Sequence, residues 1–526
     1  MAKGLSNRKV LDVAPPREVV LELLSFSGGE NTIGEDQELK SNEARRIENW
    51  EAISLGGMKR VAGINEISDG GTAYAATANA APELLIQHYE GTSTRIFLVL
   101  EGDLSYINGT SITEVDDAAF TAGKLCHGVS AGSKCWITNS TDNLQYATIG
   151  AGIATPTDQP SSARDRIYEH KSRLIAEGGG TTVYGSVAGK GNWAGANGWT
   201  TVGDAWNTDI PDVTQGCVPG WPSDGDITVF THHGSYRLFN MPNIAWLPII
   251  GSPGCSGPYT IARGTEGVFF YSRNPVKGII LWSGSQYINL TEFHDFVDDI
   301  DDTKDMFGIY KNNKYYFLYN ETGSAVSYVN KLRIYNTKYG RWMERPINTS
   351  LGDNFGYPGL LPKTNNELYL ASSRDSKVYE LETGTEDEGY PTKAVYETKD
   401  FSSRDWSIGS GGQFPIDDVS IKLIKVTVTF YGTVGAVTLL GTGDRGRISV
   451  SKVIDLTAEG AKINSDFTVN TSKVISSSDL PNKTQTFTFN NSAVAKRWSF
   501  QVLNEGTSTQ PEISKIKIHG VAVEEE

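Results

Sequence analysis

The 526-residue sequence predicts an all-β protein, a β-propeller followed by a C-terminal β-sandwich, with one short N-terminal helix. Three observations lead to this prediction. The chain holds 56 glycines and 23 tyrosines, a composition typical of short strands joined by tight turns. A hairpin pattern recurs along the middle of the chain. After Trp406 the hydrophobic pattern changes to a regular alternation, which indicates a separate domain.

Residues 1–84 are predicted to form an arm of strands with a helix. The stretch EVVLELLSFSGG reads as a strand that ends in a glycine turn. The following ELKSNEARRIENW has Glu and Arg at the spacing of a short surface helix, and SLGGMKRVAGINEI returns to strand. We therefore expect the one substantial helix of the chain in this arm.

Residues 85–400 are predicted to form the propeller. An apolar run, a tight turn and a strand carrying a tyrosine recur in STRIFLVLEGDLSYING, GIILWSGSQYINL and NELYLASSRDSKVYELETG. At about 40 to 50 residues per blade, the length of this region fits six or seven blades. A Gly/Trp-rich stretch near residues 178–225 reads as an insertion.

Residues 415–526 are predicted to form the β-sandwich, because apolar residues alternate with polar ones over several segments. The alternating residues are Ile421, Leu423, Val426, Val428, Phe430, Phe487, Phe489, Trp498, Phe500, Val502, Ile516 and Ile518.

Charge and composition narrow the classes of function. The net charge of −15 disfavours tight wrapping of nucleic acid, because phosphate binding needs clustered Lys and Arg. No run approaches the roughly 18 apolar residues of a membrane-spanning helix. The four cysteines have neither zinc-ligand nor disulfide-scaffold spacing, so we expect no metal and no cofactor. The sequence reads as that of a protein made in a reducing cytoplasm.

The motifs that could carry chemistry mostly have a structural interpretation. GTGDRG (441–446) matches a dinucleotide-binding fingerprint, but a strand follows it instead of a helix, which predicts a hairpin turn. His232 and His233 are expected on a turn surface. No pair of carboxylates and no GxSxG motif stands out, so no catalytic residue is predicted. The tryptophans of the Gly/Trp-rich stretch could stack on sugars, although packing is favoured.

An acidic segment, HDFVDDIDDTKD, provides one candidate site through Asp298, Asp299, Asp301 and Asp302. The spacing differs from that of an EF-hand loop, so a solvated or channel-facing acidic loop is favoured over a calcium site. Calcium binding stays open as the alternative.

Two further stretches bracket the predicted propeller. The first contains Phe26, Gly28, Gly29, Asn31, Glu43, Ala44, Glu48, Asn49, Gly57 and Arg60, and the second runs from Tyr396 to Phe401. Together they resemble the tail hub or nozzle proteins of short-tailed bacteriophages. We expect Phe26, Gly28, Gly29, Asn31, Asn49 and Arg60 to act as an N-terminal packing motif.

The resemblance implies a structural role without catalytic residues. Such proteins form homohexameric rings in the virion tail, below the portal and adaptor, and are made in the cytoplasm of the bacterial host. The ring leads double-stranded DNA out without binding it specifically, and it seats tail fibres or tailspikes. Acidic loops facing the channel would repel the DNA. Two other classes remain open, a tail adhesin that binds host glycans and a propeller glycosidase.

Overall fold

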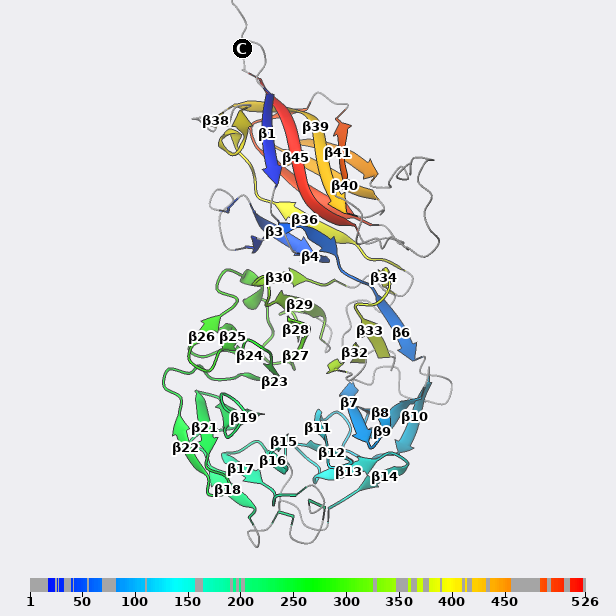
Figure 1. Cartoon of the computed structure of the whole chain (residues 1–526), viewed down its shortest axis with the longest axis vertical. Helices are drawn as coiled ribbons and strands as arrows, with labels where there is room; N and C mark the ends of the chain where they lie inside the picture. Colours follow the sequence, from blue (N-terminus) through cyan, green and yellow to red (C-terminus); the bar gives the residue numbers. More distant parts are fainter. Residues whose placement is uncertain are drawn as a thin grey trace, which may run out of the picture.

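A computed structural model describes most of residues 18–523. Outside the description lie 1–17, 33–38, 69–81, 157–163, 347–357, 361–366, 372–377, 456–482 and 524–526, together with gaps of up to five residues. The described chain is a ring of blades with a β-sandwich standing on its rim (Figure 1). The predicted fold class, a propeller followed by a sandwich, is confirmed.

Within the described residues, five blades are separate four-stranded antiparallel sheets. They comprise β7 (Pro82–Glu90), β8 (Ser93–Leu100), β9 (Asp103–Asn108) and β10 (Ser111–Asp116); β11 (Cys126–Ala131), β12 (Lys134–Asn139), β13 (Gln145–Thr148) and β14 (Ala151–Ala154); β15 (Arg166–His170), β16 (Arg173–Glu177), β17 (Thr182–Gly185) and β18 (Trp206–Asp209); β19 (Thr214–Pro219), β20 (Ile227–Thr231), β21 (Ser235–Phe239) and β22 (Ala245–Pro248); and β23 (Gly257–Arg263), β24 (Val268–Ser272), β25 (Gly278–Trp282) and β26 (Tyr287–Asn289). The predicted boundary between residues 84 and 85 falls inside β7, and the Gly/Trp-rich stretch contributes β17 to β19.

Two further blades belong to larger sheets. The sixth comprises β27 (Phe307–Lys311), β28 (Lys314–Tyr319), β29 (Lys331–Asn336) and β30 (Arg341–Glu344). The blade that closes the ring comprises β31 (Pro358–Leu360), β32 (Leu368–Ala371), β33 (Val378–Leu381) and β6 (Ile64–Ser68), extended by β34 (Glu386–Asp387) and β35 (Tyr390–Pro391). The N-terminal segment thus supplies β6, so strands from distant parts of the chain complete this blade.

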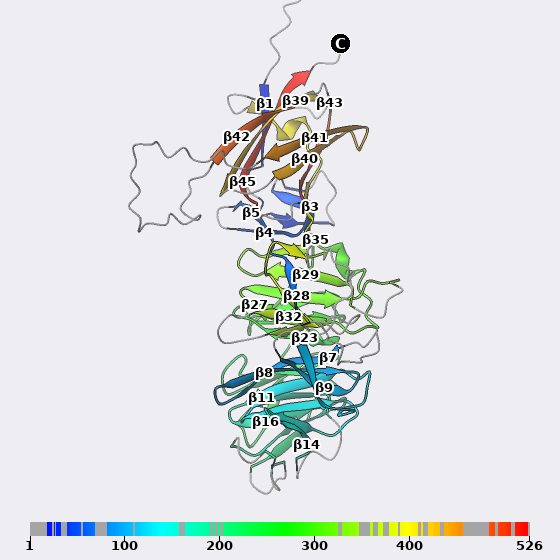
Figure 2. The same ribbon diagram turned by 90° about the vertical axis from the view of Figure 1, so that its right-hand side faces the viewer.

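The innermost strand of each blade contacts that of the next around the axis, from β7 through β11, β15, β19, β23 and β27 to β31 and back to β7. Second strands such as β20 and β24 are buried along their whole length, because a blade lies against each of their faces. Seen from the side, the ring is a flat disc below the sandwich (Figure 2).

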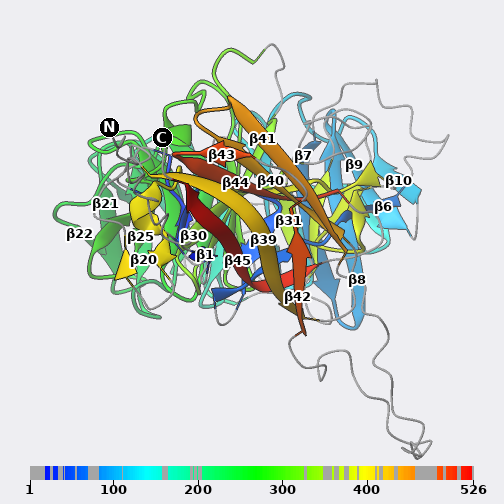
Figure 3. The same cartoon turned by 90° about the horizontal axis from the view of Figure 1, so that it is seen from above.

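The sandwich has two sheets around one apolar core. One contains β38 (Gly412–Gln413), β37 (Ser407–Ile408), β1 (Glu18–Leu23), β45 (Glu512–Val523), β39 (Ser420–Tyr431) and β42 (Lys483–Thr488), with β43 (Val494–Ala495), β4 (Trp50–Ala52) and β5 (Met58–Arg60) attached. The other contains β36 (Ala394–Thr398), β44 (Trp498–Asn504), β40 (Ala436–Gly443) and β41 (Ile448–Asp455). Viewed from above, the long strands β39 and β45 cross over the disc (Figure 3).

The expected N-terminal helix is wrong, because residues Glu43–Glu48 form strand β3. Ala44 and Ile47 are both buried, and their separation of three residues imitates the period of a helix. A β-bulge between Ala44 and Arg46 shifts the register, which lets both side chains be buried from one extended segment. Two short 3-10 turns, η2 (Asp295–Val297) and η3 (Ser403–Asp405), are the helical elements of the described chain. In that part of the protein, no helix is long and apolar enough to cross a bilayer.

Candidate functional site: the joint between propeller and sandwich

Strand β3 joins the two parts of the molecule. It pairs antiparallel with β36, where Ile47 lies opposite Tyr396, and it meets β30 of the sixth blade at Glu48 and Glu344. Since β36 pairs with β44 of the sandwich, one continuous sheet runs from the sixth blade through β3 into the sandwich. We call this region, built from β2 (Gly29–Glu30), β3, β4, β5 and β36, the joint.

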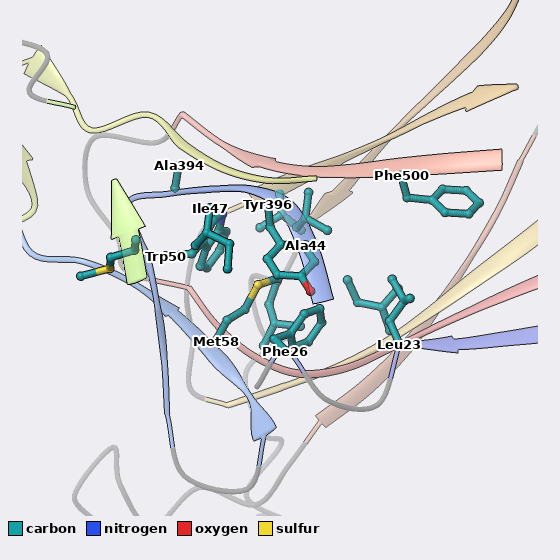
Figure 4. Packing of buried hydrophobic residues seen from close by; sticks show 14 of the residues in the cluster. Leu23, Phe26, Ala44, Ile47, Trp50, Met58, Ala394, Tyr396 and Phe500 are labelled. Atoms are coloured by element: carbon teal, nitrogen blue, oxygen red, sulfur yellow. The ribbon is translucent and has the colours of Figure 1, made fainter. Parts of the chain in front are cut away.

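Phe26 is the apolar anchor of the joint. It is buried, and its ring meets that of Tyr396 edge to face with centroids 5.0 Å apart. Met58 and Trp50 complete the same cluster (Figure 4). Edge-to-face aromatic pairs add about 0.5 to 1.5 kcal/mol beyond the burial of their surface. The pair therefore fastens the segment after β1 to the strand that leaves the propeller.

The glycines of the predicted packing motif permit close backbone approach. A Cβ atom added to Gly28 would lie 2.0 Å from the carbonyl oxygen of Asn42, which already accepts the Gly28 N–H at 2.9 Å. Gly29 pairs with Glu43 in the parallel β2–β3 ladder. Asn31 extends this contact, because its backbone N–H donates to Ala44 O at 2.8 Å.

Asn49 is the polar centre of the joint. It is buried with a φ of 53°, a left-handed conformation that Asn tolerates better than most residues. Its side-chain amide donates to the carbonyl oxygens of Pro346 at 3.1 Å and Lys393 at 2.6 Å. Its side-chain oxygen accepts from Arg345 Nη1 at 3.1 Å. Asn49 thereby binds the backbone at two points, one before and one after the closing blade in the sequence.

Two buried arginines surround Asn49. Arg345 pairs with Asp387, with Nη2 and Oδ1 2.6 Å apart, and the two side chains are only 3% and 0% exposed. Arg60 donates to the carbonyl oxygens of Thr392 at 3.2 Å and Thr385 at 2.8 Å. Burial lowers the pKa of the Arg60 guanidinium, although Asp387 counteracts part of this effect. All six motif residues expected to pack thus lie at the joint: Phe26, Gly28, Gly29, Asn31, Asn49 and Arg60.

A second buried ion pair lies on the propeller side. The Glu30 carboxylate accepts from Ile47 N at 3.1 Å and from Arg333 Nη1 at 2.5 Å. Burial raises the pKa of Glu30, while Arg333 opposes the shift. Sequence reasoning missed Glu30, Arg333, Arg345 and Asp387. Glu30 and Arg333 are 303 residues apart and Arg345 and Asp387 are 42 apart, so no local pattern marks either pair.

The acidic segment lies between β26 and β27 and is tied to its neighbours. Asp301 accepts from the N–H and hydroxyl of Thr303, and Asp302 accepts from the Tyr271 hydroxyl and pairs with Arg273 at 2.9 Å. Asp298 and Asp299 are exposed. The four side chains therefore do not converge on one point. Among the described residues, no group of three or more His, Cys, Asp or Glu could hold a metal ion.

The other candidates take structural roles. GTGDRG forms the predicted hairpin turn between β40 and β41. His232 and His233 are both exposed at the β20–β21 turn, as expected. Trp193 and Trp206 are 0% and 7% exposed, so neither offers a face to a sugar. The four cysteines are free and buried.

Comparisons with known proteins give a likeness of fold alone. No family model matches the sequence, and no curated protein does either. Among solved structures, the extracellular domain of a proposed one-component system from B. thetaiotaomicron is 13% identical over 60% of this chain and 39% of its own, with a TM-score of 0.41. A structure described as the extracellular domain of a hybrid two-component system from the same organism gives 12% identity, the same coverage and a TM-score of 0.41. The designed protein Ika8 is 7% identical over 60% of this chain and 99% of its own, with a TM-score of 0.35. The chain spans about two fifths of the length of the bacterial structures.

Proposed function

We propose that the protein is a virion structural protein, the tail nozzle or hub ring of a short-tailed bacteriophage. One observation carries the proposal. The two stretches that resemble this family are separated by the whole propeller in the sequence, yet they pair as β3 and β36 in the joint. The residues on which the resemblance rests therefore lie where propeller and sandwich are held together.

The architecture suits a part that transmits load. A continuous sheet connects the sixth blade to the sandwich, and the Arg345–Asp387 and Glu30–Arg333 pairs fix it on both sides. Buried charge pairs of this kind hold a defined geometry, because separating the partners leaves a charge without compensation. A rigid two-part subunit is what a closed ring of identical contacts needs.

The proposed ring is a homohexamer below the portal and adaptor that docks tail fibres or tailspikes. Viral DNA passes through it transiently. The net charge of −15 supports this use, because a negative lining repels phosphates and leaves the duplex free to move. The site of action is the virion tail, after synthesis in the bacterial cytoplasm.

Negative-stain class averages of the purified protein, alone and mixed with the products of neighbouring genes, test the proposal. We expect closed rings with a central channel. A protein that stays monomeric in both preparations contradicts the proposal. In that case, binding to host cells or polysaccharide would identify an adhesin, and hydrolysis of polysaccharide that one carboxylate substitution abolishes would identify a glycosidase.

The matched control for ring assembly is a variant that alters an exposed ion pair of the sandwich, Glu505→Gln, which removes the contact with Lys393 at 3.3 Å. This pair is about 60% exposed on both sides, so the subunit should fold normally. If ring assembly depends on the packing-motif residues of the joint, this variant should form rings like the parent protein.

A further inference from the structure

A cavity of about 430 Å³ lies at the centre of the propeller. Its walls come from the innermost strands β7, β11, β15, β19, β23 and β27, which surround the axis. A volume of this size lies within the range of pockets that bind small organic molecules. Arg263 is exposed and lines the cavity, so it marks an opening to solvent.

The wall of the cavity is mainly apolar and aromatic. Leu84, Ile86, Tyr259, Ile261 and Phe307 contribute to it. Among the described residues that line it, none is Asp or Glu, although the whole chain contains 62 of them. Arg263 is the charged residue of this lining. An apolar wall with a cation at its opening is complementary to an anion that has an apolar body.

His127 adds a hydrogen-bond donor to the wall. Its Nδ1 accepts the Ile167 N–H at 3.3 Å, so the ring hydrogen is carried by Nε2. Burial, helped by the nearby Arg166, lowers the pKa of His127 to about 3, and the ring is therefore neutral at physiological pH. His127 is partly exposed and lines the cavity, which makes a ligand there accessible to it.

Gln87 adds a second donor. Its side-chain oxygen accepts a hydrogen bond from the Tyr89 hydroxyl at 2.5 Å. The side-chain NH₂ group takes no part in this hydrogen bond. Gln87 and His127 both line the cavity, and each carries a side-chain N–H group.

Glu177 is a carboxylate directly behind this lining, and it is shielded from the cavity. Glu177 is fully buried and pairs with Arg166 at 3.3 Å. It also accepts from the Tyr168 hydroxyl at 3.3 Å and from Cys217 Sγ at 3.4 Å, and these two residues form the wall in front of it. A ligand in the cavity therefore meets donors and apolar surface, with the Glu177 charge compensated behind them.

We propose that the central cavity binds a small organic anion, a carboxylate with an apolar chain, whose charged end pairs with Arg263 and whose chain lies against the apolar wall. This binding function is separate from ring assembly and does not depend on it.

Isothermal titration of the full-length protein with octanoate, 1-octanol and octylammonium tests the proposal. Octanoate should bind with one site per chain and about tenfold more tightly than the other two, because only the carboxylate forms an ion pair with the Arg263 guanidinium. Arg263→Gln should weaken octanoate binding about tenfold and leave octanol binding unchanged. The matched control is Arg237→Gln, which removes an arginine that pairs with Asp226 at 2.8 Å and does not line the cavity.

Ile86→Trp provides a second test, because a larger side chain in the wall should abolish binding of both octanoate and octanol. Circular dichroism and the melting temperature of each variant show whether it has folded. Equal affinity for the three ligands, no binding at millimolar concentration, or equal effects of the Arg263 and Arg237 substitutions would overturn the proposal. Ring formation measured on the same preparations reports on the proposed function separately.

Discussion

The substitution Asp387→Asn should destabilise the joint strongly. It removes the charge that compensates Arg345, whose side chain is only 3% exposed. Two hydrogen bonds join the pair, at 2.6 and 3.2 Å. The amide oxygen of the new side chain can still accept one of these hydrogen bonds, and losing the other costs about 1.5 to 3 kcal/mol. The Arg345 charge is also left without compensation, and breaking a buried ion pair costs about 3 to 5 kcal/mol in total, which is the expected effect.

Tryptophan fluorescence during urea unfolding measures the effect, because Trp50 is buried within the joint. The chain holds 11 tryptophans and need not unfold in one step, so the same series in a Trp50→Phe background identifies the transition that reports on the joint. The double variant Arg345→Met with Asp387→Leu should be more stable than Asp387→Asn, because it leaves no buried charge unpaired. Glu505→Gln, which alters an exposed pair, should cost about 0 to 1 kcal/mol. If Asp387→Asn costs no more than Glu505→Gln, the buried pair does not stabilise the joint.

Three further predictions concern other parts of the molecule. Gly63→Ala should lower the melting temperature by an amount equivalent to about 1 to 3 kcal/mol, because the new Cβ would lie 1.9 Å from a backbone carbonyl oxygen of the closing blade. Gly180→Ala, where the nearest atom is 3.5 Å away, is its control, and equal melting of the two variants would contradict the reasoning. Burial raises the pKa of Glu83 from 4.5 to about 7. Between these two pH values the folded state binds more protons than the unfolded state, so the free energy of unfolding should fall as pH rises from 4.5 to about 7. Glu83→Gln should reduce the difference in unfolding free energy between pH 4.5 and pH 8 by up to about 3 kcal/mol, and an unchanged difference would refute the assignment. Replacing Asp298 and Asp299 with lysine should create salt-dependent DNA binding and slow DNA ejection if these exposed carboxylates face the channel, while asparagine at both positions should have the smaller effect. If the lysine variant ejects DNA at the normal rate, Asp298 and Asp299 do not face the channel.

Alternation in the sequence was sufficient to predict the sandwich strands. Val426, Val428 and Phe430 alternate with polar residues, and all three are buried in β39. The prediction succeeds because side chains alternate between the two faces of a strand, so apolar residues at every second position show which face is buried. The same logic failed at β3, where the bulge between Ala44 and Arg46 changed the period.

The joint could be predicted only in part. The resemblance pointed to Asn49 and Arg60, yet their partners could not be found from the sequence. Arg345 and Asp387 look like ordinary surface charges in the sequence, and Asp387 becomes buried because its strand β34 pairs with β6 at Ile64. The apolar pattern of a strand indicates which of its faces is buried, but it does not indicate which distant segment covers that face.

The first and the last strand of the described chain are paired in the finished fold, and this has a consequence for how the protein folds during synthesis. β1 lies beside β45, with Leu23 opposite Ile516, and β6 lies beside β33, with Ile64 opposite Leu381. During synthesis the N-terminal strands emerge first, but their partners are translated only after most of the propeller has appeared. Until then, β1 and β6 have open edges that can pair with other chains. Folding should therefore be slow and sensitive to protein concentration, and slower translation should lengthen the interval in which aggregation competes with closure.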